Sequence, residues 1–139
     1  WLMLASTVLL SAGTLWLHQL IKRLRAGMHR GLMGQLAVLA IVAFIQSALL
    51  LWLMLSADLA PTETAHDAVI FVMLAYNLIH CTLAAVLTGL QAWRVALGYV
   101  GDKAPYEPIV VEQLWYYNLG VLWVSYAAIV LFPATWGGA

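Results

Sequence analysis

The stretch LMGQLAVLAIVAFIQSALLLWLML, residues 32–55, contains no Asp, Glu, Lys or Arg and ends shortly before Asp58 and Pro61. A helix needs about 20 mostly apolar residues to cross the hydrocarbon core of a bilayer. Lipid offers no hydrogen-bond partners to the backbone, so a segment of this kind crosses as a helix. The stretch therefore predicts a transmembrane helix.

Three further apolar stretches accompany it, covering about residues 1–21, 68–96 and 110–132. We therefore predict an all-α fold: a single membrane domain over residues 1–139, built as an integral membrane bundle of four transmembrane helices. The third stretch is longer than a bilayer requires. We expect its end, with Arg94, to project into the headgroups or the helix to tilt.

The composition also indicates lipid as the solvent. The chain is 65% hydrophobic and 9% charged, whereas soluble domains are nearer half apolar and a quarter charged. A net charge of +0 provides no basic surface for nucleic acid. The single cysteine, Cys81, excludes an intrachain disulfide. Because Trp1 already lies inside an apolar segment, we expect an upstream part.

Charged residues between the spans are separated by sign. The connection after the first span carries Lys22, Arg23, Arg25 and Arg30. The connection after the third carries Lys103, with Arg94 at its edge. The connection after the second has no Lys or Arg but contains Asp58, Glu63 and Asp67. The positive-inside rule places both basic connections in the cytoplasm, with the acidic connection and both ends outside.

Polar side chains recur at helical spacing within two spans. Those of the first span are Thr7, Ser11, Thr14 and His18; those of the third are Asn77, His80, Thr88 and Gln91. Such stripes favour hydrogen bonding between helices, and the alternative is a path for protons or lipid headgroups. Small residues in the second span predict a close packing face: Ala37, Ala40, Ala43 and Ser47.

We expect a set of intramembrane and near-membrane side chains to make lipid or interhelical polar contacts: Trp16, His18, Gln46, Asn77, His80, Gln91 and Arg94. No catalytic, cofactor-binding or metal-ligating residue is predicted. His18 and His80 lie on different spans at different depths, and no carboxylate lies deep in a span to join them. A haem needs facing axial ligands, and zinc needs three or four.

Other histidines and aromatic residues are assigned to the surface. His29 and His66 are predicted in solvated connections. The cluster Trp115-Tyr116-Tyr117, with Trp123 further along the fourth span, is typical of an anchor at the membrane–water interface. Docking against a larger neighbouring subunit is the alternative interpretation of this cluster.

Four segments, taken together, resemble a known family. They are Trp16-Leu17-His18, Phe44-Ile45-Gln46, Leu78-Ile79-His80, and Leu114-Trp115-Tyr116-Tyr117 followed by Gly120-Val121-Leu122-Trp123. In order and spacing they are similar to Trp-x-His, an aromatic-rich helix end, His-Gly-Leu-His and Trp-His-Phe-x-Asp-Val-Val-Trp. Those motifs belong to subunit III of the haem-copper oxidases, which include cytochrome c oxidase and the quinol oxidases.

The resemblance covers essentially the whole chain and corresponds to the C-terminal four helices of that subunit. The chain departs from the family pattern at Asn77, Tyr116-Tyr117 and Gly120, and has Leu49 and Trp52 where acidic residues usually follow. It therefore resembles a divergent member or a relative.

The resemblance implies an accessory, non-catalytic subunit that holds neither haem nor copper. Both would belong to its partner, a larger haem-bearing catalytic subunit. Subunit III packs against that partner, binds phospholipid between helix groups and helps to sustain proton uptake and turnover. We accordingly expect the bacterial inner (cytoplasmic) membrane as its location.

Other functions remain as alternatives. The accessory subunit of a nitric oxide reductase is a sibling within the same family. An unrelated small transporter or channel is less consistent, because no span has an interior proline and the two halves do not resemble each other. A cytochrome b-like electron carrier is disfavoured because the histidines do not converge.

The charge pattern gives a testable topology. A cysteine at Met28 should react with a membrane-impermeant maleimide only from the cytoplasmic side, and one at Thr64 only from the opposite side. Labelling of intact and inverted vesicles measures this. Reaction of both positions from the same side would contradict the topology.

Overall fold

A computed structural model describes residues 1–27, 31–99 and 106–131. It contains four helices, α1 (Leu2–Arg25), α2 (Leu32–Ser56), α3 (Ala65–Ala96) and α4 (Tyr106–Leu131), and no strand within those ranges. All four are long and apolar enough to cross a membrane. The prediction of an all-α integral membrane bundle is confirmed.

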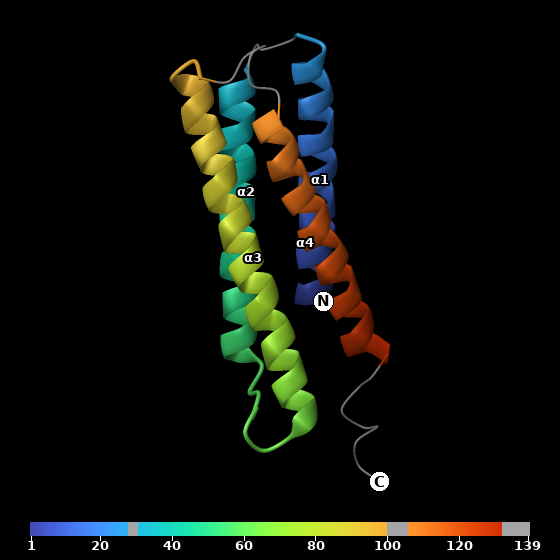
Figure 1. Cartoon of the computed structure of the whole chain (residues 1–139). Helices are drawn as coiled ribbons and strands as arrows, with labels where there is room; N and C mark the ends of the chain where they lie inside the picture. The colour runs from blue at the N-terminus through green and yellow to red at the C-terminus, as the bar shows by residue number, and fades with distance from the viewer. Residues whose placement is uncertain (28–30, 100–105, 132–139) are drawn as a thin grey trace.

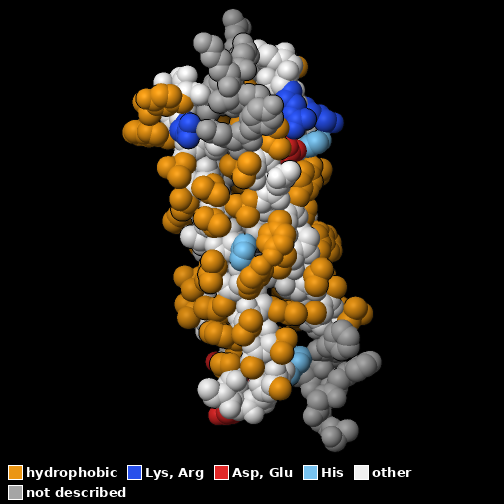
Figure 2. Space-filling view, in the orientation of Figure 1, with side chains coloured by type: hydrophobic (Ala, Val, Ile, Leu, Met, Phe, Trp, Pro, Cys, Tyr) orange, Lys and Arg blue, Asp and Glu red, His pale blue; other side chains and the backbone are white. Residues whose placement is uncertain are grey.

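The helices run alternately up and down (Figure 1). α2 packs against α1 and α3, and α4 packs against the same two helices, so the four form a closed ring. The start of α1, the α2–α3 connection and the end of α4 lie at one end of the bundle. Basic residues in the last turns of α1 and α3 lie at the other end, and hydrophobic side chains cover the surface between (Figure 2).

Three helices extend beyond the predicted spans by more than a single residue. α1 continues to Arg25, because basic side chains near a helix C-terminus interact favourably with the helix dipole. α4 includes Pro108 in its first turn, where the missing N–H has no partner within the helix anyway. α3 begins at Ala65, since the Thr64 hydroxyl accepts a bond of 3.0 Å from the Asp67 N–H.

The longer α3 corrects one sequence prediction. His66 lies in the first turn of this helix and is half-buried, not in a solvated connection. The N-cap at Thr64 explains the difference, because it starts the helix before the apolar residues begin. His29, predicted in the first connection, lies outside the described residues.

Small side chains bring α2 and α3 together. A Cβ built on Gly89 of α3 would lie 3.9 Å from the Ala40 Cβ of α2. On the predicted packing face, Ala43 and Ser47 are buried, and Ala37 and Ala40 are half-buried. The face therefore packs as predicted, with the close approach that small residues permit in membranes.

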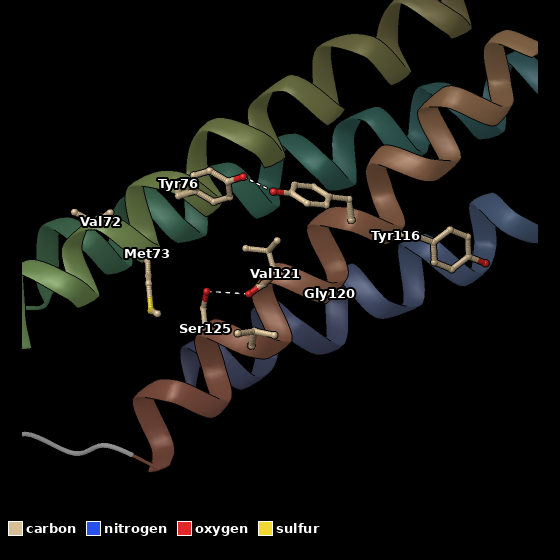
Figure 3. Close-up of a pocket in the computed structure, with 9 residues that line it drawn as sticks. Val72, Met73, Tyr76, Tyr116, Gly120, Val121 and Ser125 are labelled. Carbon is tan, nitrogen blue, oxygen red and sulfur yellow. Dashed lines mark hydrogen bonds between the residues drawn. The ribbon is translucent and has the colours of Figure 1, made fainter.

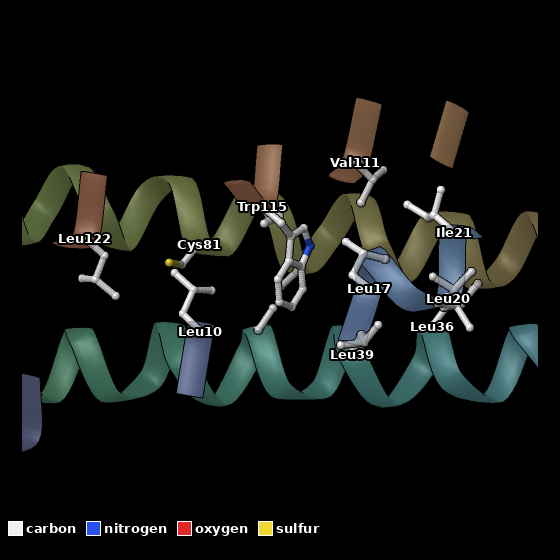
Figure 4. Packing of buried hydrophobic residues seen from close by; sticks show 14 of the residues in the cluster. Leu10, Leu17, Leu20, Ile21, Leu36, Leu39, Cys81, Val111, Trp115 and Leu122 are labelled. Carbon is white, nitrogen blue, oxygen red and sulfur yellow. The ribbon is translucent and has the colours of Figure 1, made fainter. Parts of the chain in front are cut away.

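Trp115 of α4 lies at the centre of the bundle. Its exposed fraction is 0%, and Figure 4 shows its indole among buried side chains that include Leu10, Leu17 and Leu39. Its Nε1–H donates to the Thr88 hydroxyl of α3 at 3.0 Å. Predicting Trp115 as an interfacial anchor was wrong, because its ring fills the space above a glycine of α1. Its neighbours Tyr116 and Tyr117 are exposed.

That glycine is Gly13. A Cβ built there would lie 2.7 Å from the Trp115 Cζ3 and 3.3 Å from its Cη2. The ring is buried and bonded to Thr88, so moving it aside would cost packing and this bond. A methyl group at this position therefore displaces either the ring or the backbone of α1.

Gly13→Ala should destabilise the bundle by about 1–3 kcal/mol, the usual cost of overpacking a filled core. Gly34→Ala on α2 is the matched control, because no atom in the described part of the chain lies within 4 Å of a Cβ there. Thermal unfolding in detergent, followed by far-UV circular dichroism, measures both. Equal melting temperatures for the two variants would disprove this account of the core.

Candidate functional site

His18 of α1 and Glu112 of α4 form an acid–base pair. The His18 Nδ1 lies 2.6 Å from the Glu112 Oε1, and the two side chains are 36% and 9% exposed. The His18 ring also meets Tyr116 edge-on, with ring centroids 6.0 Å apart. An imidazole and a carboxyl group at this distance form a hydrogen bond, which gives Glu112 a polar partner inside an apolar helix.

The sequence alone did not reveal this pair. The helical spacing groups His18 with the hydroxyl stripe of its own helix, and the expectation that no carboxylate lies deep in a span is wrong for Glu112 of α4. Both lie about two helical turns from the basic end of the bundle, on helices that run antiparallel. Their similar depth in the membrane is the sequence signal that could have predicted this contact.

The hydroxyl stripe of α1 is satisfied mainly within its own helix. The Thr7, Ser11 and Thr14 hydroxyls donate to backbone carbonyls four residues earlier, at 2.7, 2.7 and 2.8 Å. Ser11 also accepts from the Trp123 Nε1 of α4 at 3.4 Å. Hydroxyls bonded in this way destabilise their own helix only slightly. Of these three residues, only Ser11 also links α1 to another helix.

Amide side chains make three further links between helices. The Gln46 Nε2 of α2 donates to the Ser6 hydroxyl of α1. The Asn77 Nδ2 of α3 donates to the Ser125 hydroxyl of α4 at 2.9 Å. The Asn118 Nδ2 of α4 donates to the His80 carbonyl at 3.0 Å. These residues are buried and join adjacent members of the ring.

His80 lies on the outer surface, where α3 meets α4. Its Nδ1 bonds the Tyr76 carbonyl at 2.9 Å, and its ring centroid is 4.1 Å from that of Tyr76 and 5.6 Å from that of Tyr117. The hydroxyls of the two tyrosines are hydrogen-bonded to each other. Beside them runs a groove of about 480 Å³ between the two helices. We call Tyr76, His80 and Tyr117 the aromatic cluster.

The remaining sequence candidates are Trp16, Gln91 and Arg94. Trp16 is exposed on α1, and Arg94 is exposed in the last turn of α3. Gln91 is buried, and its Oε1 has no hydrogen-bond partner among the described residues. His18 and His80 do not meet, since each contacts a different part of α4. Among the described residues, no group of three His, Cys, Asp or Glu side chains could hold a metal ion.

No protein-family model, curated protein or solved structure matches the chain. The contacts themselves therefore carry the functional argument. They divide into polar links inside the ring and the aromatic cluster on its surface.

Because Glu112 is more deeply buried than His18, we expect the replacement of each residue to destabilise the bundle to a different extent. His18→Leu should destabilise the bundle by about 1–3 kcal/mol, because it leaves a buried carboxylate without its partner. Glu112→Leu should cost less, since the more exposed imidazole keeps access to water or headgroups. Unfolding in detergent of both variants and of the double variant measures this. The prediction fails if Glu112→Leu proves the more damaging change.

Proposed function

We propose that this chain is a non-catalytic accessory subunit of a haem-copper terminal oxidase, similar to subunit III. In this role it stabilises a larger haem-bearing catalytic subunit and binds phospholipid in the bacterial inner membrane. Haem and copper belong to the partner, and this chain supplies packing and lipid contacts.

One observation carries the proposal: two of the segments that resemble subunit III, on α1 and α3, contact α4, which carries the last of these segments. His18 of the Trp16-Leu17-His18 segment contacts Glu112 and Tyr116. His80, which ends the Leu78-Ile79-His80 segment, contacts Tyr117 and is bonded through its carbonyl by Asn118. Residues scattered in sequence thus form one connected set, as expected if the resemblance reflects a shared helix arrangement.

The distribution of polar groups also supports a structural role. The amide and indole donors of Gln46, Asn77 and Trp115 bond other helices of the same bundle. The exposed surface of the helices is largely aliphatic and aromatic. A chain built in this way is suited to packing within a membrane.

The basic end of the bundle supports the lipid-binding part of the proposal. Lys22, Arg23 and Arg25 end α1, and Arg94 lies in the last turn of α3. Side chains of this kind attract anionic headgroups at the cytoplasmic surface. His18 lies about two turns deeper on α1, where a headgroup cleft would begin.

The two alternative functions, a transporter and the accessory subunit of a nitric oxide reductase, make different structural demands. Transporters build midplane sites from discontinuous helices, whereas all four helices here are continuous over the described ranges. The accessory subunit of a nitric oxide reductase would use the same contacts, and only the metal content of the partner separates it from the oxidase proposal.

Purification of the native complex through a tag on this chain tests the proposal. We expect a co-purifying haem-bearing subunit, identified by its haem spectrum, together with copper. Haem without copper would favour the nitric oxide reductase alternative. Absence of any haem-bearing subunit would refute the proposal.

Deletion of the chain gives a second measurement. The haem centres of the partner should still assemble and show initial activity, because this chain is proposed to hold none of them. Turnover number or catalytic lifetime should fall. Complete loss of the haem spectrum on deletion would contradict an accessory role.

A further inference from the structure

The groove between α3 and α4 is open on the surface of the bundle. It is lined by apolar side chains such as Val72, Met73 and Val124, with Gly120 in its α4 wall (Figure 3). Gly120 is exposed, and no atom in the described part of the chain lies within 4 Å of a Cβ built on it. A backbone from outside the chain can therefore approach α4 closely at this point.

The aromatic cluster borders this groove with unused hydrogen-bonding capacity. The Tyr76 carbonyl can only accept, so the His80 Nδ1 carries the proton and its Nε2 is a free acceptor in the neutral ring. No described group pairs with that Nε2. In the bond between the Tyr76 and Tyr117 hydroxyls only one proton is shared, so the other phenol keeps an O–H to donate.

Lipid does not satisfy these groups. His80 lies halfway along α3 (Ala65–Ala96). In a hydrocarbon core about 30 Å thick, the headgroups are then about 15 Å away on either side. Acyl chains offer neither a donor nor an acceptor. A polar partner at this depth must come from a membrane-embedded segment outside the described residues.

The outer face of α2 is built differently. Its exposed side chains along the middle of the helix are aliphatic or aromatic, among them Val38, Ile41, Phe44 and Leu51. This face matches acyl chains and has no unpaired imidazole. α2 and α4 occupy opposite positions in the ring, so the bundle has one face suited to lipid and one suited to a protein neighbour.

We propose that a transmembrane helix of the larger haem-bearing subunit docks in the α3–α4 groove. Its backbone passes close to Gly120, and one of its side chains donates a hydrogen bond to the His80 Nε2. A donor of the Ser, Thr, Asn, Gln, Tyr or Trp type meets this requirement. The inference rests on the proposed function and specifies which face carries the partner.

Gly120→Leu tests the docking surface without disturbing the bundle. The added Cβ meets open space within the described part of this chain, and the leucine side chain occupies the position proposed for the incoming helix. Gly34→Leu on α2 is the matched control, because that glycine is also helical, exposed and open. Both variants should retain the helical circular dichroism and melting temperature of the natural chain.

The measurement is the amount of haem recovered per copy of this chain when the complex is purified through a tag on the chain. We expect Gly120→Leu to lower it at least about tenfold and Gly34→Leu to leave it unchanged. Any other pattern between the two variants overturns the inference, while the proposed function stands if the natural chain recovers the haem-bearing subunit. If the natural chain recovers none, both fail.

A photo-crosslinking residue at Val124 identifies the occupant, with one at Phe44 as the control on α2. Both side chains are exposed on helices of the folded bundle. Crosslinking of Val124, but not Phe44, to the haem-bearing subunit supports the inference. Crosslinking of Val124 only to lipid, to a quinone or to a second copy of this chain overturns it.

Discussion

The indole of Trp115 can occupy the middle of this bundle only because α1 carries a glycine where the two helices meet. The ring lies against Gly13 on one side and bonds Thr88 of α3 on another. One side chain of α4 thereby sets the position of α4 relative to both of its neighbours. With α4 in this position, Ser125 reaches Asn77 of α3 and Glu112 reaches His18 of α1, at two different levels along the bundle.

The number of helices and their approximate ends could be predicted from the sequence, because hydrophobic length alone decides how often a chain crosses a bilayer. The rotation of each helix could not. Trp115 follows the start of an apolar span, where an indole suits the membrane interface as well as a helix contact. Only the small residue opposite, Gly13, distinguishes the two, and its partnership with α4 requires knowledge of which helices are neighbours.

The same limit explains which polar contacts were missed. Helical spacing correctly grouped Thr7, Ser11, Thr14 and His18 on one face, yet these residues have different roles. The hydroxyls bond their own backbone, whereas His18 bonds a residue of α4. The His80 imidazole bonds a carbonyl of its own helix, so the side-chain type does not settle the partner either. The choice depends on which groups the neighbouring helix presents at the same depth.

The hydroxyls of α1 bear on how the protein is made. Because Thr7 and Thr14 are satisfied by the carbonyls of their own helix, these two hydroxyls let α1 enter lipid before α2, α3 and α4 have been translated. His18 has no such local partner, and Glu112 lies 94 residues further along the chain. During synthesis its imidazole must stay near the wet boundary of the bilayer until α4 arrives. Closure of the ring therefore waits for α4, which is translated after α1, α2 and α3.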